Sequence, residues 1–160
     1  MNNGISSYVR LVTAQAVAAS TTLVTLGSTG TGNSAFQFGT TVSPMAAAAK
    51  VHLSIRLAFT IGATGGFKFQ LIPPATPGNF TMTGFVMDTV TPATIPVAQN
   101  PTAAAFANAL AVAGTHLFHA EVDYTNGVTA GTLALQFACN SAANSITVLP
   151  GSWMSAVLGS

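Results

Sequence analysis

The chain has 160 residues, of which 49% are hydrophobic and only 4% are charged, whereas an average protein has about 25% charged residues. The hydrophobic content excludes charge-driven disorder, the formal net charge of +1 argues against a nucleic-acid partner, and no apolar run approaches the roughly 20 residues of a membrane-spanning helix. A surface with so few charges favours association with other proteins, and the length suits a single domain, 1–160.

The first forty residues contain weak strand patterns. We expect strands at 8–13, 22–26 and 35–38, with the glycine-rich segment 27–33 as a turn between the last two. The first four residues carry no basic side chain, which a secretory signal requires. We therefore expect the chain to be made in the cytosol.

The middle of the chain holds the clearest strand, 50–61. Its apolar side chains alternate strictly with the others, and they are Val51, Leu53, Ile55, Leu57, Phe59 and Ile61. The same period of two recurs in 67–71, and 80–88 is a weaker candidate. This alternation is typical of antiparallel strands that turn one face toward a core.

Residues 102–113 fit two structures. Their alanine content favours a short helix, which would place Phe106 and Leu110 on one face. The alternative is a strand or an extended loop that leads into the next strand, near His116. Both alternatives remain open on the sequence alone, and neither changes the functional interpretation.

The last third of the chain returns to clear strand patterns. Alternation marks 118–124 and 132–139, and weaker strands are expected at 145–149 and 153–158. Cys139, the only cysteine, lies on the apolar side of its strand, so we expect a small buried residue and no internal disulfide. About ten short strands separated by turns predict an all-β protein, an antiparallel β-sandwich.

Four of the seven charges lie on the outward side of predicted strands. They are Arg56 and Lys68, which we expect on neighbouring strands, and Glu121 and Asp123 on a third. We expect these groups to pair across strands or to lie in a subunit interface, where buried charges need partners. The alternative is that they are simply exposed to solvent.

The chain lacks a convincing catalytic or metal-binding pattern. His116 and His119 are three residues apart on a strand and point to opposite faces, so they do not converge on one ion. His119, Glu121 and Asp123 share a face, but structural zinc normally takes four ligands, chiefly Cys and His. The sequence also lacks a GxSxG motif and a phosphate-binding glycine loop. We expect no enzyme activity, no cofactor and no metal.

Two motifs in the last third carry a family resemblance. GTLALQF (131–137) and TVLPGSW (147–153) resemble a recurring bacteriophage virion domain, in which GTLxLQWAQN leads through a polar loop to TTVLAGSWL. Residues 50–71 look like the preceding strand pair of that domain, and 17–26 with 36–38 look like its N-terminal strands. The chain departs from the family at Phe137, where Trp is common, and at 138–140, where Ala-Cys-Asn replaces Ala-Gln-Asn.

The resemblance implies a jelly-roll sandwich of eight to ten strands, similar to C1q and tumour-necrosis-factor heads and usually a homotrimer. Such heads occur in capsid decoration or cement proteins, head fibres and tail-fibre tips. We expect a trimeric decoration protein that binds the major capsid protein on the virion surface. The alternative is a fibre or spike head that binds a host receptor through loops such as 27–33 and 73–79. A fibre shaft would need heptads or repeats, which the sequence lacks.

Two rival classes have less support. One is a free or secreted binding module of the C1q type, and the other is an enzyme on a sandwich scaffold. No residue pattern favours either of them. For the decoration protein, we expect residues 1–10 to form a contact arm and Trp153 to be a candidate for the trimer core. The candidate interface residues are Tyr8, Arg10, Arg56, Lys68, His119, Glu121 and Asp123.

Overall fold

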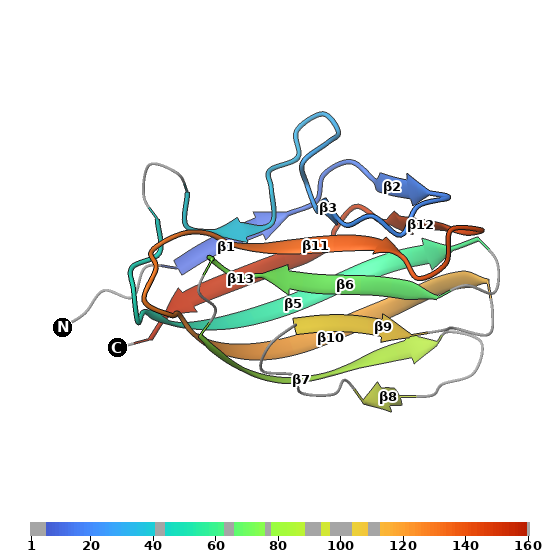
Figure 1. Cartoon of the computed structure of the whole chain (residues 1–160). Coiled ribbons are helices and arrows are strands. Elements are labelled where there is room, and N and C mark those ends of the chain that lie inside the picture. Colours follow the sequence, from blue (N-terminus) through green and yellow to red (C-terminus); the bar gives the residue numbers. More distant parts are fainter. Residues whose placement is uncertain are drawn as a thin grey trace.

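The chain folds into antiparallel β-sheets. The computed structural model describes residues 6–40, 44–62, 66–75, 78–88, 94–96, 104–108 and 113–159. All the elements assigned in these residues are β-strands (Figure 1). The described residues accordingly include no helix long and apolar enough to cross a membrane. The predicted all-β class is confirmed, and the two sheets pack as a sandwich-like arrangement.

The described strands number thirteen, against about ten expected. They are β1 (Ser6–Arg10), β2 (Gln15–Ala18), β3 (Val24–Thr25), β4 (Gln37–Phe38), β5 (Lys50–Ile61), β6 (Phe67–Ile72), β7 (Asn79–Asp88), β8 (Thr94–Pro96), β9 (Ala104–Asn108), β10 (Gly114–Thr125), β11 (Leu133–Cys139), β12 (Ser145–Val148) and β13 (Trp153–Leu158). The bounds predicted from alternation agree with the observed strand bounds to within a few residues. β2 and β8 were not predicted as separate strands.

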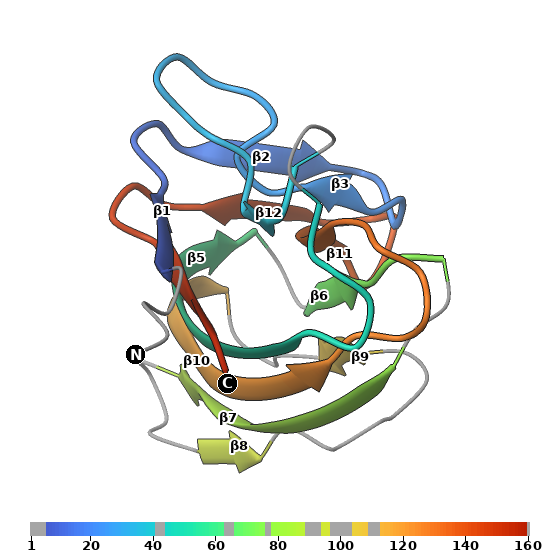
Figure 2. The same ribbon diagram turned by 90° about the vertical axis from the view of Figure 1, so that its left-hand side faces the viewer.

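The larger sheet is built around the long strands β5 and β10. Its strands follow the order β1-β13-β5-β10-β7-β8, and each neighbouring pair is antiparallel. Figure 2 shows this sheet curving around the smaller one. The inward residues of β5 are fully or almost fully buried and its outward residues are not, so the predicted alternation of 50–61 is confirmed.

Two different strands pair with the same edge of β5. β13 pairs with residues 51–56 and β12 with residues 59–61, so the ladder breaks opposite Ala58. The buried Ser152 fills the break, because its hydroxyl accepts a hydrogen bond from the Ala58 amide at 3.0 Å and lies 2.8 Å from the Leu149 carbonyl. Gly151 adopts a φ of 87° at this point, a conformation that favours glycine. The break sets the position from which Trp153 begins β13.

The smaller sheet has the order β3-β11-β6-β9, with β4 also paired to β11. β9 pairs with β6 from residue 104 to 108, so this described part of the ambiguous segment 102–113 is a strand and not a helix. β6 belongs to the smaller sheet and β5 to the larger one. The expectation that Arg56 and Lys68 lie on neighbouring strands is therefore wrong, because the chain crosses between sheets after β5.

The core lies between the sheets and is rich in phenylalanine. The ring centroid of Phe59 on β5 lies 5.1 Å from that of Phe67 and 5.3 Å from that of Phe69, both on β6, and the Phe59 and Phe69 rings meet edge to face. The Phe69 centroid lies 5.1 Å from that of Phe118 on β10. Burying each such side chain stabilises the fold by roughly 1.5–3 kcal/mol before the entropy of ordering is subtracted. Cys139 is fully buried on β11, as predicted.

Candidate functional site

The outer face of the larger sheet aligns its functional side chains in rows. The antiparallel registers place Trp153 of β13 opposite Arg56 of β5, Arg56 opposite His119 of β10, and His119 opposite Phe85 of β7. Arg10 of β1 extends the row beyond Trp153. Each of these residues has outward parity, because its sequence neighbours in the strand point into the core.

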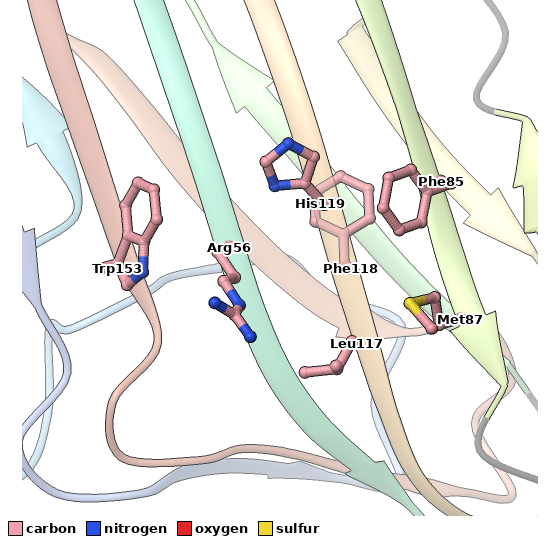
Figure 3. A pocket seen from close by; sticks show the side chains of 7 residues that line it. All are labelled: Arg56, Phe85, Met87, Leu117, Phe118, His119 and Trp153. Atoms are coloured by element: carbon pink, nitrogen blue, oxygen red, sulfur yellow. The ribbon is translucent and has the colours of Figure 1, made fainter.

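A groove of about 290 Å³ lies over this row. Figure 3 shows the Arg56 side chain with Trp153 on one side and the β10 residues His119 and Leu117 on the other. Phe85 and Met87 of β7 line the far wall, and the Phe85 and His119 rings are 5.4 Å apart. We call this feature the outer-face groove, and it is lined by Trp153, Arg56, His119, Phe85, Leu117, Met87 and the buried Phe118.

An acid-histidine cluster extends from this row into the next two rows of the same face. It consists of His119 from the groove row, Ser54 and Glu121 from the next row, and His52 and Asp123 from the row after that. The two ring nitrogens of His52 lie 2.8 Å from an Asp123 oxygen and 3.1 Å from a Glu121 oxygen. Ser54 donates a hydrogen bond of 2.6 Å to the other Glu121 oxygen, which also lies 3.3 Å from His119 Nε2. The cluster therefore satisfies both oxygens of Glu121 from within the chain.

The geometry of the cluster favours a protonated His52. The hydrogen bond that His52 donates to Asp123 is the largest cause that raises the pKa of His52 above its usual 6.5, and the charges of Asp123 and Glu121 act in the same direction. Desolvation opposes them because it penalises the charged imidazolium. A protonated ring donates from both nitrogens, which matches the two carboxylates that face it.

Six of the seven predicted interface residues share one face. Tyr8, Arg10, Arg56, His119, Glu121 and Asp123 all lie on the outer side of the larger sheet, and Lys68 lies on β6 of the other sheet. Whether this face is an interface stays a prediction. The acids do form pairs, but with His52 and His119, and the expected cross-strand pairing with Arg56 and Lys68 is not among the described contacts.

Arg56 has a different environment from the one expected. No described carboxylate forms an ion pair with Arg56 or with Lys68. Glu121 and Asp123 bond to His52, Ser54 and His119 instead, and Lys68 lies on the other sheet. His52 and Ser54 were not expected as partners of these acids. Their outward parity in 50–61 was visible, but their place opposite Asp123 and Glu121 follows from the register of β5 with β10.

A second feature of the face lies at its edge. Tyr8 is 62% exposed and Val157 is 44% exposed, and together with Arg10 they form what we call the β1–β13 strip. The Tyr8 ring packs 6.1 Å from that of Trp153. Among the described strands, β1 pairs with β13 alone, so its other edge carries no described strand. Open edges of this kind are ready to pair with another chain.

The histidine spacing behaves as predicted. His116 is fully buried and packs 5.5 Å from Phe59, whereas His119 faces outward, so the two rings lie on opposite sides of β10. Within the described ranges, no group of three or more His, Cys, Asp and Glu side chains is arranged to hold a metal ion.

Comparisons with known proteins leave the function open. No family model matches the chain, and no curated protein matches it. One similar solved structure contains modules of xylanase 10B from Clostridium thermocellum with xylohexaose, at 11% identity, 95% coverage of this chain, 27% of that chain and a TM-score of 0.33. Another is infectious bursal disease virus, strain Gt, at 11% identity, 98% coverage of this chain, 38% of that chain and a TM-score of 0.24. TM-scores this low do not indicate a shared fold.

Proposed function

We propose that the chain is a non-enzymatic structural protein of a bacteriophage virion, a homotrimeric jelly roll that decorates the capsid surface and binds the major capsid protein. The single observation that best supports this role is the β1–β13 strip. It places the exposed Tyr8 on β1, whose outer edge has no described partner strand, and the exposed apolar Val157 on the neighbouring strand β13. Apolar area next to an open edge favours association with another protein.

The composition supports association as well. Seven charged residues in 160 give little protection against contact with a second copy or with a capsid lattice. Three copies that bind a lattice together gain affinity from their linkage without any new contact, which suits a shell component. The expected contact arm, 1–10, includes β1, although residues 1–5 lie outside the described residues.

The motifs of the family resemblance have clear structural roles here. In TVLPGSW, Gly151 takes the positive φ at the strand break, Ser152 bonds across the break to Ala58, and Trp153 starts β13 on the outer face. In GTLALQF, Gly131 contacts Pro74 so closely that an added Cβ would lie 2.9 Å from it. Motif residues that fix the backbone are consistent with a shared architecture, in support of the jelly-roll proposal.

Copy number per particle tests the proposed role. Quantitative mass spectrometry of purified virions should give a ratio to the major capsid protein between about one third and one, as trimers on a lattice require. A few to some tens of copies would instead indicate the head of a fibre or spike that binds a host receptor. Absence from the virion would contradict both roles.

A matched pair of variants tests the contact surface. Tyr8→Glu places a charge in the β1–β13 strip and should reduce incorporation into particles at least about tenfold, because an unpaired charge in an interface is costly. Val128→Glu makes the same change at a loop residue that is 83% exposed, and it should be incorporated normally. Equal incorporation of both variants would place the contact elsewhere.

A further inference from the structure

The outer-face groove contains a cation whose charge the described part of the chain does not balance. Arg56 is exposed on β5 and forms no ion pair with a described residue. Glu121, one row away on the same face, directs one oxygen to His52 and the other to Ser54 and His119. As far as the described residues go, the guanidinium of Arg56 is therefore available to an anion from outside the chain.

The position of Arg56 favours one type of anion. A guanidinium presents its donors as a planar fork that matches the two oxygens of a carboxylate. Trp153 and His119 flank Arg56 in register, so an approaching anion meets a ring on each side. Arg10, the only other arginine of the chain, lies on the far side of Trp153 and adds positive charge to the same row.

The other residues that line the groove determine which chemical group can carry the carboxylate. Phe85, Leu117 and Met87 are apolar, and they lie along the side of the groove away from Trp153. A volume of about 290 Å³ is near the lower end of typical ligand sites, which run from roughly 300 to 1,000 Å³. Such a space accommodates about one ring with a short substituent, and it is too small for a folded partner segment.

We propose that the outer-face groove binds a small organic acid, a carboxylate carried on a ring, with Arg56 holding the carboxylate and Phe85, Leu117 and Trp153 contacting the ring. Binding of such a ligand does not depend on the virion role, because the groove is formed within one copy of the chain. The ring can belong to an aromatic acid or to a sugar acid, which share the chemistry that Arg56 recognises.

Trp153 makes this site directly measurable. It is the only tryptophan of the chain and it lines the groove, so its fluorescence reports on the site without a label. The probes are benzoate and galacturonate, each compared with a neutral analogue, benzyl alcohol and galactose. The titration should be repeated at two protein concentrations, so that self-association is distinguished from ligand binding.

We expect at least one of the two acids to change the emission saturably, with a Kd of about 1 mM, as is reasonable for a small ligand in an open groove. The neutral analogues should change it far less. A response to benzoate identifies the ring as aromatic, and a response to galacturonate identifies a sugar acid. No saturable response to either acid, or equal responses to the neutral analogues, would overturn the proposal.

The assignment of Arg56 has its own test. Arg56→Gln should weaken binding about tenfold or more, because a charge-assisted bidentate contact is lost. Lys68→Gln removes the same charge from the other sheet and should leave the Kd unchanged. If Arg56→Gln does not fold, Leu117→Glu, which sets a carboxylate in the groove wall, should abolish binding instead. Unchanged binding in either groove variant would overturn the assignment.

Discussion

Two neighbouring parts of one sheet face differ in whether their charged side chains have partners among the described residues. In the acid-histidine cluster, Glu121 and Asp123 find partners on the adjacent strand, and His52 lies within 3.1 Å of both. In the outer-face groove, one row away, Arg56 is surrounded by rings and apolar side chains and has no described carboxylate partner. Residues of equal parity on this face therefore separate into structural and available groups through their cross-strand neighbours.

A substitution in the core tests the alternation of inward and outward residues that places both parts on one face. Leu57 is fully buried beside the outward-facing Arg56. Leu57→Asp should prevent folding, because an unpaired carboxylate in the core costs several kcal/mol. Arg56→Asp, the matched control one residue away, should fold. Circular dichroism and thermal unfolding distinguish the two, and a folded, soluble Leu57→Asp protein would show that the two faces are inverted.

A smaller effect concerns the strand break that positions Trp153 beside the groove. Ser152→Ala removes the hydroxyl that accepts the hydrogen bond of the Ala58 amide, leaving that amide without its partner. We expect the free energy of unfolding to fall by about 1–3 kcal/mol, together with a shift in tryptophan emission. Ser155→Ala, on the outer side of β13, should change the stability by no more than about 0.5 kcal/mol. Equal effects of the two variants would contradict the bridging role.

Removing one charge from each part should affect stability differently. Glu121→Gln disrupts contacts with His52, Ser54 and His119, and it should lower the free energy of unfolding by up to about 1 kcal/mol, the upper range for exposed pairs. Arg56→Gln should change it by less than about 0.5 kcal/mol. Urea unfolding of both variants provides the measurement. A larger loss for Arg56→Gln would mean that Arg56 has a structural partner.

The pH dependence of stability that arises from the acid-histidine cluster should be small. His52 should titrate above its usual pKa of 6.5 by NMR, and Asp123→Asn should lower this pKa more than Glu121→Gln, since the Asp123 hydrogen bond is the largest cause. A raised folded-state pKa stabilises the protein below the unfolded-state value, and this contribution is lost as pH rises through the folded-state pKa. Its size should stay below about 1 kcal/mol because the pair is exposed. An unshifted pKa would contradict the geometry.

Much of the fold was predictable because period-two alternation is a local property. The strand 50–61 was expected with the bounds that the structure gives to β5, and its inward residues form the core. Residues 104–108 were ambiguous because alanine favours a helix, whereas pairing with β6 makes them a strand. Tertiary context overrides propensity in such segments. β8 was not predicted as a strand because it has only three residues and ends in proline.

The candidate site was less predictable than the fold. The sequence placed Arg56, His119, Glu121 and Asp123 on outward faces, but it did not show that β5 pairs with β10 and that β6 belongs to the other sheet. The row from Trp153 to Phe85 joins residues from four strands separated by up to about a hundred positions, a juxtaposition that strand registers alone determine.

The proposed homotrimer is tested most directly by the mass of the protein in solution. Sedimentation equilibrium at micromolar concentration should give a species three times the mass of the 16.1 kDa chain. A stable monomer, or a dimer, over the same concentration range would contradict the proposed role.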